Sequence, residues 1–170
     1  YWLAGMGGFD AIAHAMTTIA TGGFSTSDGS FGAFDSALID AIAVAGMVAG
    51  SLPFMLYLKT SQGDLKALAA DSQVQWFLAI AGVVVVVAAA WLWLENGLQP
   101  LQALRYASFN VVSILTGTGY ASTDYGAWGS FAVPVFFFIM FIGGCAGSTT
   151  CGIKIFRFQV LYATQLNSLH

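Results

Sequence analysis

Phe77 to Leu94 is a run of apolar residues without a single charge, and it includes five consecutive valines, Val83 to Val87. A helix that crosses the hydrocarbon core of a bilayer needs about 20 predominantly apolar residues. The composition agrees with such a helix, because 58% of the residues are hydrophobic and 8% are charged, whereas soluble domains have about 25% charged residues. We therefore expect an all-α membrane protein.

Two further stretches are comparably apolar. Ser36 to Leu58 has one charge near its start, Asp40, and Gly129 to Ile142 continues through a polar break into Ile153 to Leu161. Pro53, after Ala49-Gly50-Ser51, predicts a kink or a packing contact inside the first of them. Tyr1 to Met6 is interpreted as the end of an earlier helix, since it lacks the basic n-region of a signal peptide. These stretches predict a protein that crosses the membrane several times.

The charges fall into two groups along the chain. Lys59 and Lys66 lie between the first two apolar stretches, and Lys154 and Arg157 follow the polar break. The positive-inside rule places these four residues on the cytoplasmic side. Arg105 alone breaks the pattern. The acidic residues that fall on the opposite side are Asp28, Asp35, Glu95 and Asp124.

The chain contains an internal repeat, in which each unit consists of a span, a short helix, a Gly/Thr loop and a second span. We predict a partial unit over residues 1–60, a cytoplasmic linker over 61–73, and a second unit over 74–170 with a broken last span. A shift of 96 residues pairs Thr17 with Ser113, Gly23 with Gly119, and Phe24 with Tyr120, and a shift of 97 pairs Ala49-Gly50-Ser51 with Ala146-Gly147-Ser148.

The two short helices are expected over Phe9 to Ala20 and Pro100 to Leu115. With at most about 16 residues, they reach only part way through a hydrocarbon core of about 30 Å. The loop after each helix must return to the outer surface, and its non-helical backbone is tolerated at that depth only where it lines a water-filled cavity or is buried in protein. The carbonyl ends of the helices favour a cation there. The loops are therefore predicted to line an ion route, or else to be packing hairpins without conduction.

Carbonyl oxygens of such loops can replace the hydration shell of an ion, and glycine permits the positive φ angles that this requires. We expect the ion to be held at Gly22, Gly23, Thr118 and Gly119. The complete set of predicted ion-filter residues is Thr21, Gly22, Gly23, Phe24, Thr116, Gly117, Thr118, Gly119 and Tyr120.

Residues 143–152 interrupt the last apolar stretch with a composition that breaks a helix at membrane depth, so their backbone must face protein or water. One interpretation is a gate on the cytoplasmic side of the filter, and the other is a close packing seam of small residues. The predicted gating residues are Gly143, Gly144, Gly147, Ser148, Thr149 and Gly152.

Several polar residues near the short helices have two interpretations. Hydroxyl groups such as those of Thr17 and Ser113 either support the loops or bond back to their own helices. His14 senses pH or binds a metal, or it forms a local hydrogen bond, and Asp10 is expected to cap the first short helix. No catalytic constellation is present, so we expect neither an enzyme nor a nucleic-acid partner.

Three motifs carry a resemblance to a known family: Ala20-Thr21-Gly22-Gly23-Phe24-Ser25-Thr26, Thr116-Gly117-Thr118-Gly119-Tyr120, and Gly143-Gly144-Cys145-Ala146-Gly147-Ser148-Thr149 followed by Gly152-Ile153-Lys154. With these motifs the sequence resembles the Trk/Ktr/HKT superfamily of potassium and sodium uptake proteins. The resemblance implies four membrane-pore-membrane repeats around one ion pathway. This chain would supply the second repeat, without its start, and the third.

The resemblance further implies that Gly23 and Gly119 are filter glycines associated with potassium, and that residues 143–152 form the gating loop. The family loop usually continues Ser-Thr-Gly-Gly-Gly, whereas this chain has Thr150 and Cys151 before Gly152. Potassium would be the transported ligand, without a covalent cofactor, in the plasma membrane, or the inner membrane of a bacterium. Expected partners are membrane lipid, the remaining repeats, a second copy in a homodimer and a cytoplasmic nucleotide-binding regulatory subunit.

Two alternative functions stay open. A secondary transporter with broken helices would bind a small solute near the midplane, and it would need midplane coupling groups. A noncatalytic membrane assembly subunit would use the glycine motifs for packing alone.

Overall fold

The computed structural model describes residues 1–64 and 66–168, and the regular structure in these ranges is helical apart from an isolated β-bridge between Ile142 and Ile153. Leu65, in the predicted linker, and residues 169–170, at the end of the second predicted unit, lie outside the described residues. The helices are α1 (Gly8–Ile19), α2 (Ala37–Gly50), α3 (Phe54–Ser61), α4 (Ala67–Ala70), α5 (Ser72–Leu94), α6 (Pro100–Leu115), α7 (Ala132–Ile139) and α8 (Ile155–Ser168), with 3₁₀ helices η1 (Trp2–Ala4), η2 (Ser30–Ala33) and η3 (Tyr125–Trp128).

Helix α5 contains the charge-free run and has 23 residues, which at 1.5 Å per residue gives a length of about 35 Å. Asp71 caps its start, where one carboxylate oxygen accepts from the backbone N–H groups of Gln73 and Val74 at 2.9 and 3.2 Å. Among the described residues it is the helix long and apolar enough to cross a membrane by itself. The bent pair α2 and α3 would be a second span if counted as one.

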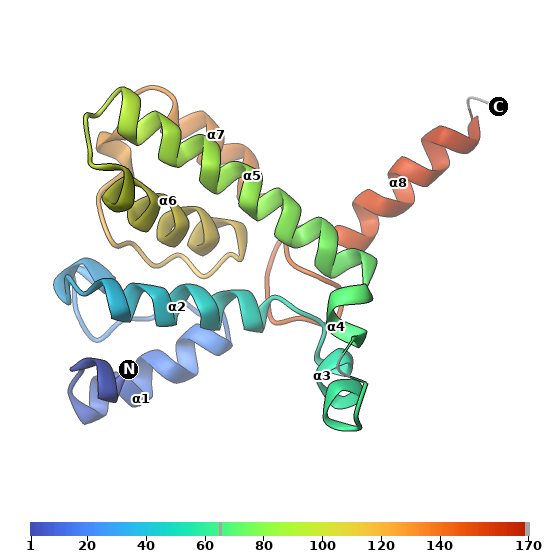
Figure 1. Ribbon diagram of the computed structural model, residues 1–170, viewed down its shortest axis with the longest axis horizontal. Coiled ribbons are helices and arrows are strands. Elements are labelled where there is room, and N and C mark those ends of the chain that lie inside the picture. Colours follow the sequence, from blue (N-terminus) through green and yellow to red (C-terminus); the bar gives the residue numbers. More distant parts are fainter. Residues whose placement is uncertain (65, 169–170) are drawn as a thin grey trace.

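The two short helices form as predicted. Helix α6 has the predicted bounds, with Pro100 in its first turn, and α1 begins and ends one residue earlier than predicted. Figure 1 shows α6 lying along α5 and ending about half-way along it, while α1 lies beside α2. The prediction that Asp10 caps α1 is wrong: Gly7 is the N-cap residue, and the Asp10 carboxylate accepts from the Thr26 hydroxyl at 2.7 Å.

The predicted span Ser36 to Leu58 is interrupted at the place where the sequence predicts a kink. It is divided into α2 and α3, whose axes differ by 94°. The Ser51 hydroxyl bonds back to the Met47 carbonyl at 2.7 Å, which often bends a helix, and Pro53 has no N–H to continue the ladder. The predicted kink is therefore a near right-angle bend between two separate helices. Helix α2 alone, with 14 residues, is only about 21 Å long.

The last predicted span is broken where expected, but its pieces differ in length from the prediction. Helix α7 covers only Ala132–Ile139 of the predicted Gly129 to Ile142. The residues before it form η3 and a turn at Gly129, whose φ is +95°. Helix α8 continues to Ser168, beyond the predicted end at Leu161, and it leaves the main group of helices in Figure 1. The first six residues form the single turn η1 rather than the end of a regular helix.

Helix α6 lies at the centre of the packing. Ala103, Ala107, Val111 and Leu115 follow one another at intervals of four and are completely buried in one cluster, with residues of α5 and α7. The opposite side of α6 contributes Phe109 and Val112 to a second cluster, with residues of α2 and the ring of Phe31. The two predicted units are therefore joined through α6, and the loop that follows it is held on both sides.

Candidate functional site

The two Gly/Thr loops lie against each other. A β-carbon built on Gly23 would lie 1.7 Å from the carbonyl oxygen of Thr118, so no residue other than glycine fits at this approach. Gly23 and Gly119 both have positive φ angles, +73° and +82°. A β-carbon on Gly119 would meet no atom within 4 Å. Residues that are 96 apart in sequence thus meet at one place, and Gly119 borders open space there.

The loop carbonyls divide into two groups by their hydrogen bonds. The carbonyl of Phe24 accepts from the Thr17 hydroxyl at 3.0 Å, and that of Tyr120 accepts from the Ser113 hydroxyl at 2.7 Å. In the part of the chain that the structure describes, no protein group donates to the carbonyls of 21–23 or 116–119. These seven oxygens therefore differ from the carbonyls of Phe24 and Tyr120, which accept from hydroxyl groups of the short helices.

One polar side chain on each short helix fixes the outer end of its loop. His14 Nδ1 lies 2.7 Å from the Asp10 carbonyl, and its Nε2 lies 3.0 Å from the Ser25 hydroxyl. Asn110 stands 96 residues later, donates to the Ser122 hydroxyl at 2.9 Å, and accepts from the Ser122 N–H at 3.3 Å. Both side chains are completely buried. The local interpretation of His14 is confirmed, and Asn110 is a site residue that the sequence analysis missed, although the 96-residue shift pairs it with His14.

The aromatic residues of the two loops have different surroundings. The side chain of Phe24 is 77% exposed, whereas Tyr120 is completely buried. The Tyr120 ring packs on Phe31 with the ring centroids 4.4 Å apart. Its hydroxyl group forms a hydrogen bond with the Thr17 hydroxyl, on the other short helix. The two positions that the repeat pairs are therefore not equivalent in the structure.

Residues 143–152 fill the gap between α2 and α3. The carbonyls at the end of α2 accept from this segment: Gly50 accepts from the Thr149 N–H at 3.1 Å, and Ser51 accepts from the Cys145 N–H at 3.0 Å. In the other direction, the Phe54 N–H donates to the Gly147 carbonyl at 3.1 Å. In Figure 1 the segment passes between the end of α2 and the starts of α5 and α8. The break in the first span and the break in the last span thus satisfy each other's backbone groups.

Lys154 and Thr150 form a hydrogen-bond cluster within residues 143–154. The Lys154 ammonium group donates to the hydroxyl groups of Ser148 and Thr150, at 3.3 and 2.9 Å, and to the Thr150 carbonyl. The Thr150 hydroxyl also accepts from the Gly144 N–H at 2.9 Å. At the neck of the segment the Gly143 N–H donates to the Ile153 carbonyl at 2.9 Å, and Gly152 has a φ of +77°. Thr150, which replaces a glycine of the usual family pattern, is therefore a hydrogen-bonding centre.

The same segment contacts the inner end of both Gly/Thr loops. The Thr149 hydroxyl lies 3.0 Å from the carbonyl of Ile19, the last residue of α1. The Thr21 hydroxyl donates to the Thr149 hydroxyl at 3.1 Å. A β-carbon on Gly117 would lie 3.2 Å from that of Cys151, so Cys151 packs behind the second loop. The predicted gating residues therefore lie directly next to the predicted ion-filter residues.

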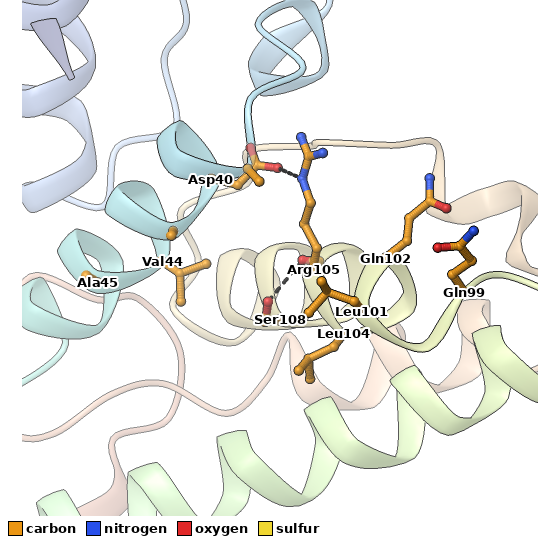
Figure 2. A pocket seen from close by; sticks show the side chains of 11 residues that line it. Asp40, Val44, Ala45, Gln99, Leu101, Gln102, Leu104, Arg105 and Ser108 are labelled. Carbon is orange, nitrogen blue, oxygen red and sulfur yellow. Dashed lines mark hydrogen bonds and ion pairs between the residues drawn. The ribbon is translucent and has the colours of Figure 1, made fainter. Parts of the chain in front are cut away.

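A groove between α2 and α6, with a volume of about 710 Å³, lies apart from these loops (Figure 2). At its edge Arg105 Nε donates to Asp40 Oδ2 at 2.7 Å, and Arg105 Nη2 donates to Asp35 at 3.2 Å. The Asp40 side chain is only 3% exposed. Arg105, which breaks the charge pattern of the sequence, thus joins the second unit to the first through Asp40 and Asp35.

Comparisons with known proteins give one family. A family model described as "TrkH: Cation transport protein" matches residues 1–170. The chain is 46% identical to the Trk system potassium uptake protein TrkI of Halomonas elongata over 94% of the chain and 32% of the relative. It is 36% identical to the Trk system potassium uptake protein TrkH of Escherichia coli over 95% of the chain and 34% of the relative.

A solved structure agrees with these relatives. The crystal structure of the potassium transporter TrkH from Vibrio parahaemolyticus matches with a TM-score of 0.92 and 37% identity, over 99% of the chain and 37% of that protein. The fold is therefore that of an all-α membrane protein, as predicted. The chain spans about a third of the length of the curated relatives it matches.

Proposed function

The chain belongs to the TrkH family of cation transport proteins, and from this premise we propose that it supplies two pore units of a potassium uptake protein. The relatives TrkI and TrkH are named potassium uptake proteins, and the chain covers about a third of their length. The resemblance of the loop motifs to the Trk/Ktr/HKT superfamily implies that the two units are the second and third of four, and the remaining units would complete one pathway around the Gly/Thr loops.

Potassium would pass through the space bordered by the free carbonyls of the two loops. The observation that carries this proposal is the meeting of Gly23 with Thr118, next to seven carbonyl oxygens that accept no hydrogen bond from residues 1–64 or 66–168. Such oxygens can replace the hydration shell of a monovalent ion. The C-terminal ends of α1 and α6 lead directly into the two loops that meet, so their carbonyl dipoles would favour a cation there. We place the ion at Gly22, Gly23, Thr118 and Gly119.

Residues 143–152 would act as the gate. Two contacts support this proposal: the Thr149 hydroxyl donates to the Ile19 carbonyl at the end of α1, and Cys151 packs against Gly117 in the second loop. Lys154 stabilises this closed arrangement through Ser148 and Thr150. Opening would require these bonds to break, and glycines with positive φ at both Gly147 and Gly152 supply the backbone freedom.

The surroundings of the site support a multi-pass protein of the plasma membrane, which is the inner membrane in bacteria such as those of the relatives. In Figure 1, α3, α4 and the starts of α5 and α8 lie at one end of the molecule. Lys59 belongs to α3, and α8 begins directly after Lys154, so the proposed gate would face the cytoplasm by the positive-inside rule. We propose, further, that the complete protein forms a homodimer and binds a nucleotide-binding regulatory subunit on that side.

Uptake of rubidium tests the proposal. The complete transporter would be expressed in a bacterium that lacks its own potassium uptake systems, and growth at low potassium and rubidium influx would be measured. We expect influx that potassium inhibits more strongly than sodium does. A chain that is present in the membrane, at the level of a functional relative, but does not support influx would contradict the proposed function.

The two alternatives give different results in a binding measurement. A filter predicts that potassium raises the melting temperature of the purified transporter more than sodium does, because a ligand that binds only the folded state stabilises it. A secondary transporter of a small solute would instead be stabilised by that solute together with a coupling ion. An assembly subunit would be stabilised by neither.

A further inference from the structure

The strongest feature that the proposed function leaves unexplained is the buried hydroxyl group of Tyr120. It forms a hydrogen bond with the Thr17 hydroxyl, and it lies 3.5 Å from both the Thr18 hydroxyl and the Phe24 carbonyl. Tyr120 belongs to the loop of the second unit, whereas its three partners belong to the helix and loop of the first. A direct polar connection between the two units therefore runs through one phenol group.

The two units share one hydrogen-bond arrangement, and the bond of the Tyr120 hydroxyl is present in addition to it. In both units a hydroxyl group of the short helix holds the carbonyl of the loop aromatic residue: Thr17 holds Phe24, and Ser113 holds Tyr120. The side chain at position 24 is a phenylalanine, which has no hydroxyl group to offer, and it is 77% exposed. Of these two paired aromatic residues, Tyr120 is therefore the one whose side chain forms a hydrogen bond to the other unit.

The Thr17 and Tyr120 hydroxyl groups have one proton each, and either group can be the donor in the bond that joins them. The Thr17 hydroxyl has one proton and two carbonyl acceptors at 3.0 Å, Ala13 on its own helix and Phe24 in the loop. When Tyr120 donates to the Thr17 oxygen, the threonine proton is free to go to a carbonyl, and donation to Phe24 gives an unbroken chain from one loop to the other. Without the phenol donor, the threonine can bond back to Ala13, as such residues do in helices.

We propose that Tyr120 is a positioning residue for ion selectivity: its hydroxyl group, acting through Thr17, fixes the orientation of the Phe24 carbonyl and the separation of the two loops. This inference rests on the proposed function, because it assigns the residue that holds the two loops at one distance. We call this connection from Tyr120 through Thr17 to Phe24 the brace. Burial makes the brace rigid, since Tyr120 is completely buried and its ring packs on Phe31. Tyr120 itself need not touch the ion.

Tyr120→Phe removes only the oxygen atom and keeps the packing of the ring. In the complete transporter we expect the preference for potassium over sodium in rubidium-influx competition to fall by about two- to tenfold, the range that a single neutral hydrogen bond can account for. Thr17→Val should give the same loss, because it removes the acceptor. Thr17→Ser, which keeps the hydroxyl group, is the matched control and should retain the preference.

The double variant Tyr120→Phe with Thr17→Val distinguishes a brace from two independent effects. If the two residues act as one unit, the double variant loses no more preference than either single variant. Additive losses, or a full preference in Tyr120→Phe, would overturn the proposal. A lower melting temperature with an unchanged ion preference would show a structural role only, and would also overturn it.

A separate variant keeps this test distinct from the proposed function. Gly119→Ser alters the loop that is proposed to contact the ion, and it does not involve the phenol. Loss of preference in Gly119→Ser but not in Tyr120→Phe would reject the brace and leave the filter proposal standing. Unchanged preference in both would reject the filter as well.

Discussion

Gly119 gives the sharpest test of the proposed filter, because its surroundings separate steric effects from effects on the ion. A β-carbon on Gly119 would meet no protein atom within 4 Å, whereas one on Gly23 would lie 1.7 Å from the Thr118 carbonyl oxygen. Gly119→Ser therefore places a β-carbon and a hydroxyl group in the open space beside the free carbonyls. Gly23→Ser must instead force the two loops apart.

The cost of Gly119→Ser to folding can be estimated from the backbone. Its φ of +82° lies in the left-handed region, where a non-glycine residue costs about 1–2 kcal/mol, and no steric term is added. The transporter should therefore still assemble. If the substitution disturbs one carbonyl contact with the ion, we expect the preference for potassium over sodium to fall by about tenfold, which corresponds to about 1.4 kcal/mol.

The matched control is Gly97→Ser. Gly97 also has a positive φ, +66°, and a β-carbon on it would also meet no atom within 4 Å, but it lies in the turn between α5 and α6, away from the loops. The assay is competition of sodium and potassium against rubidium influx, with the amount of protein in the membrane measured in parallel. An unchanged preference in Gly119→Ser would refute the assignment. An equal change in Gly97→Ser would show that backbone strain, and not contact with the ion, produces the effect.

Three further predictions concern the gate and the contact between the units. The double substitution Thr150→Gly and Cys151→Gly gives the pattern usual in the family, and it should raise rubidium influx. The reason is that it removes the hydroxyl group that bonds to Gly144, Ser148 and Lys154. Thr150→Ser keeps the hydroxyl group and should not change influx. Lys154→Met should also raise influx, since it removes the ammonium donor from the same cluster. Arg157→Met removes an equal charge one turn away and serves as the control. Equal influx in both variants would count against the proposed gate. Arg105→Leu should destabilise the purified transporter by about 3–5 kcal/mol in a denaturant-unfolding measurement, because it leaves the Asp40 carboxylate buried at 3% exposure without its partner. Adding Asp40→Asn to the same chain should recover part of the lost stability.

Local signals in the sequence predicted the elements whose boundaries are set locally. Helix α6 has the predicted bounds, since Pro100 suits a first turn and Gly117, with a φ of +72°, ends the helix. The break between α2 and α3 was expected only as a kink, because its bend depends on residues about 95 positions away. Cys145 and Thr149 satisfy the carbonyls of Ser51 and Gly50, and no pattern of apolar residues contains that information.

The candidate site divides in the same way. The repeat located both loops, and a closer use of the same 96-residue shift would have paired Asn110 with His14. It could not indicate that the Tyr120 hydroxyl reaches Thr17, because that contact depends on how α1 and α6 pack around Phe31. Arg105 was visible only as an exception to the charge pattern, and its role follows from the approach of α2 to α6.

The differences between the two units are therefore more informative about selectivity than their similarity. Each unit alone has the same helix end, the same hydroxyl-to-carbonyl bond and a glycine with positive φ, and a pathway built from identical units would need no connection between loops. The hydrogen bond between the Tyr120 and Thr17 hydroxyl groups has no counterpart at Phe24, and through it the position of the first loop would depend on the second. The inner ends of both loops also contact residues 149–151. A movement of the proposed gate would therefore act on two loops that are already joined by the hydrogen bond between Tyr120 and Thr17. Gating and ion preference should then change together in variants of Thr149.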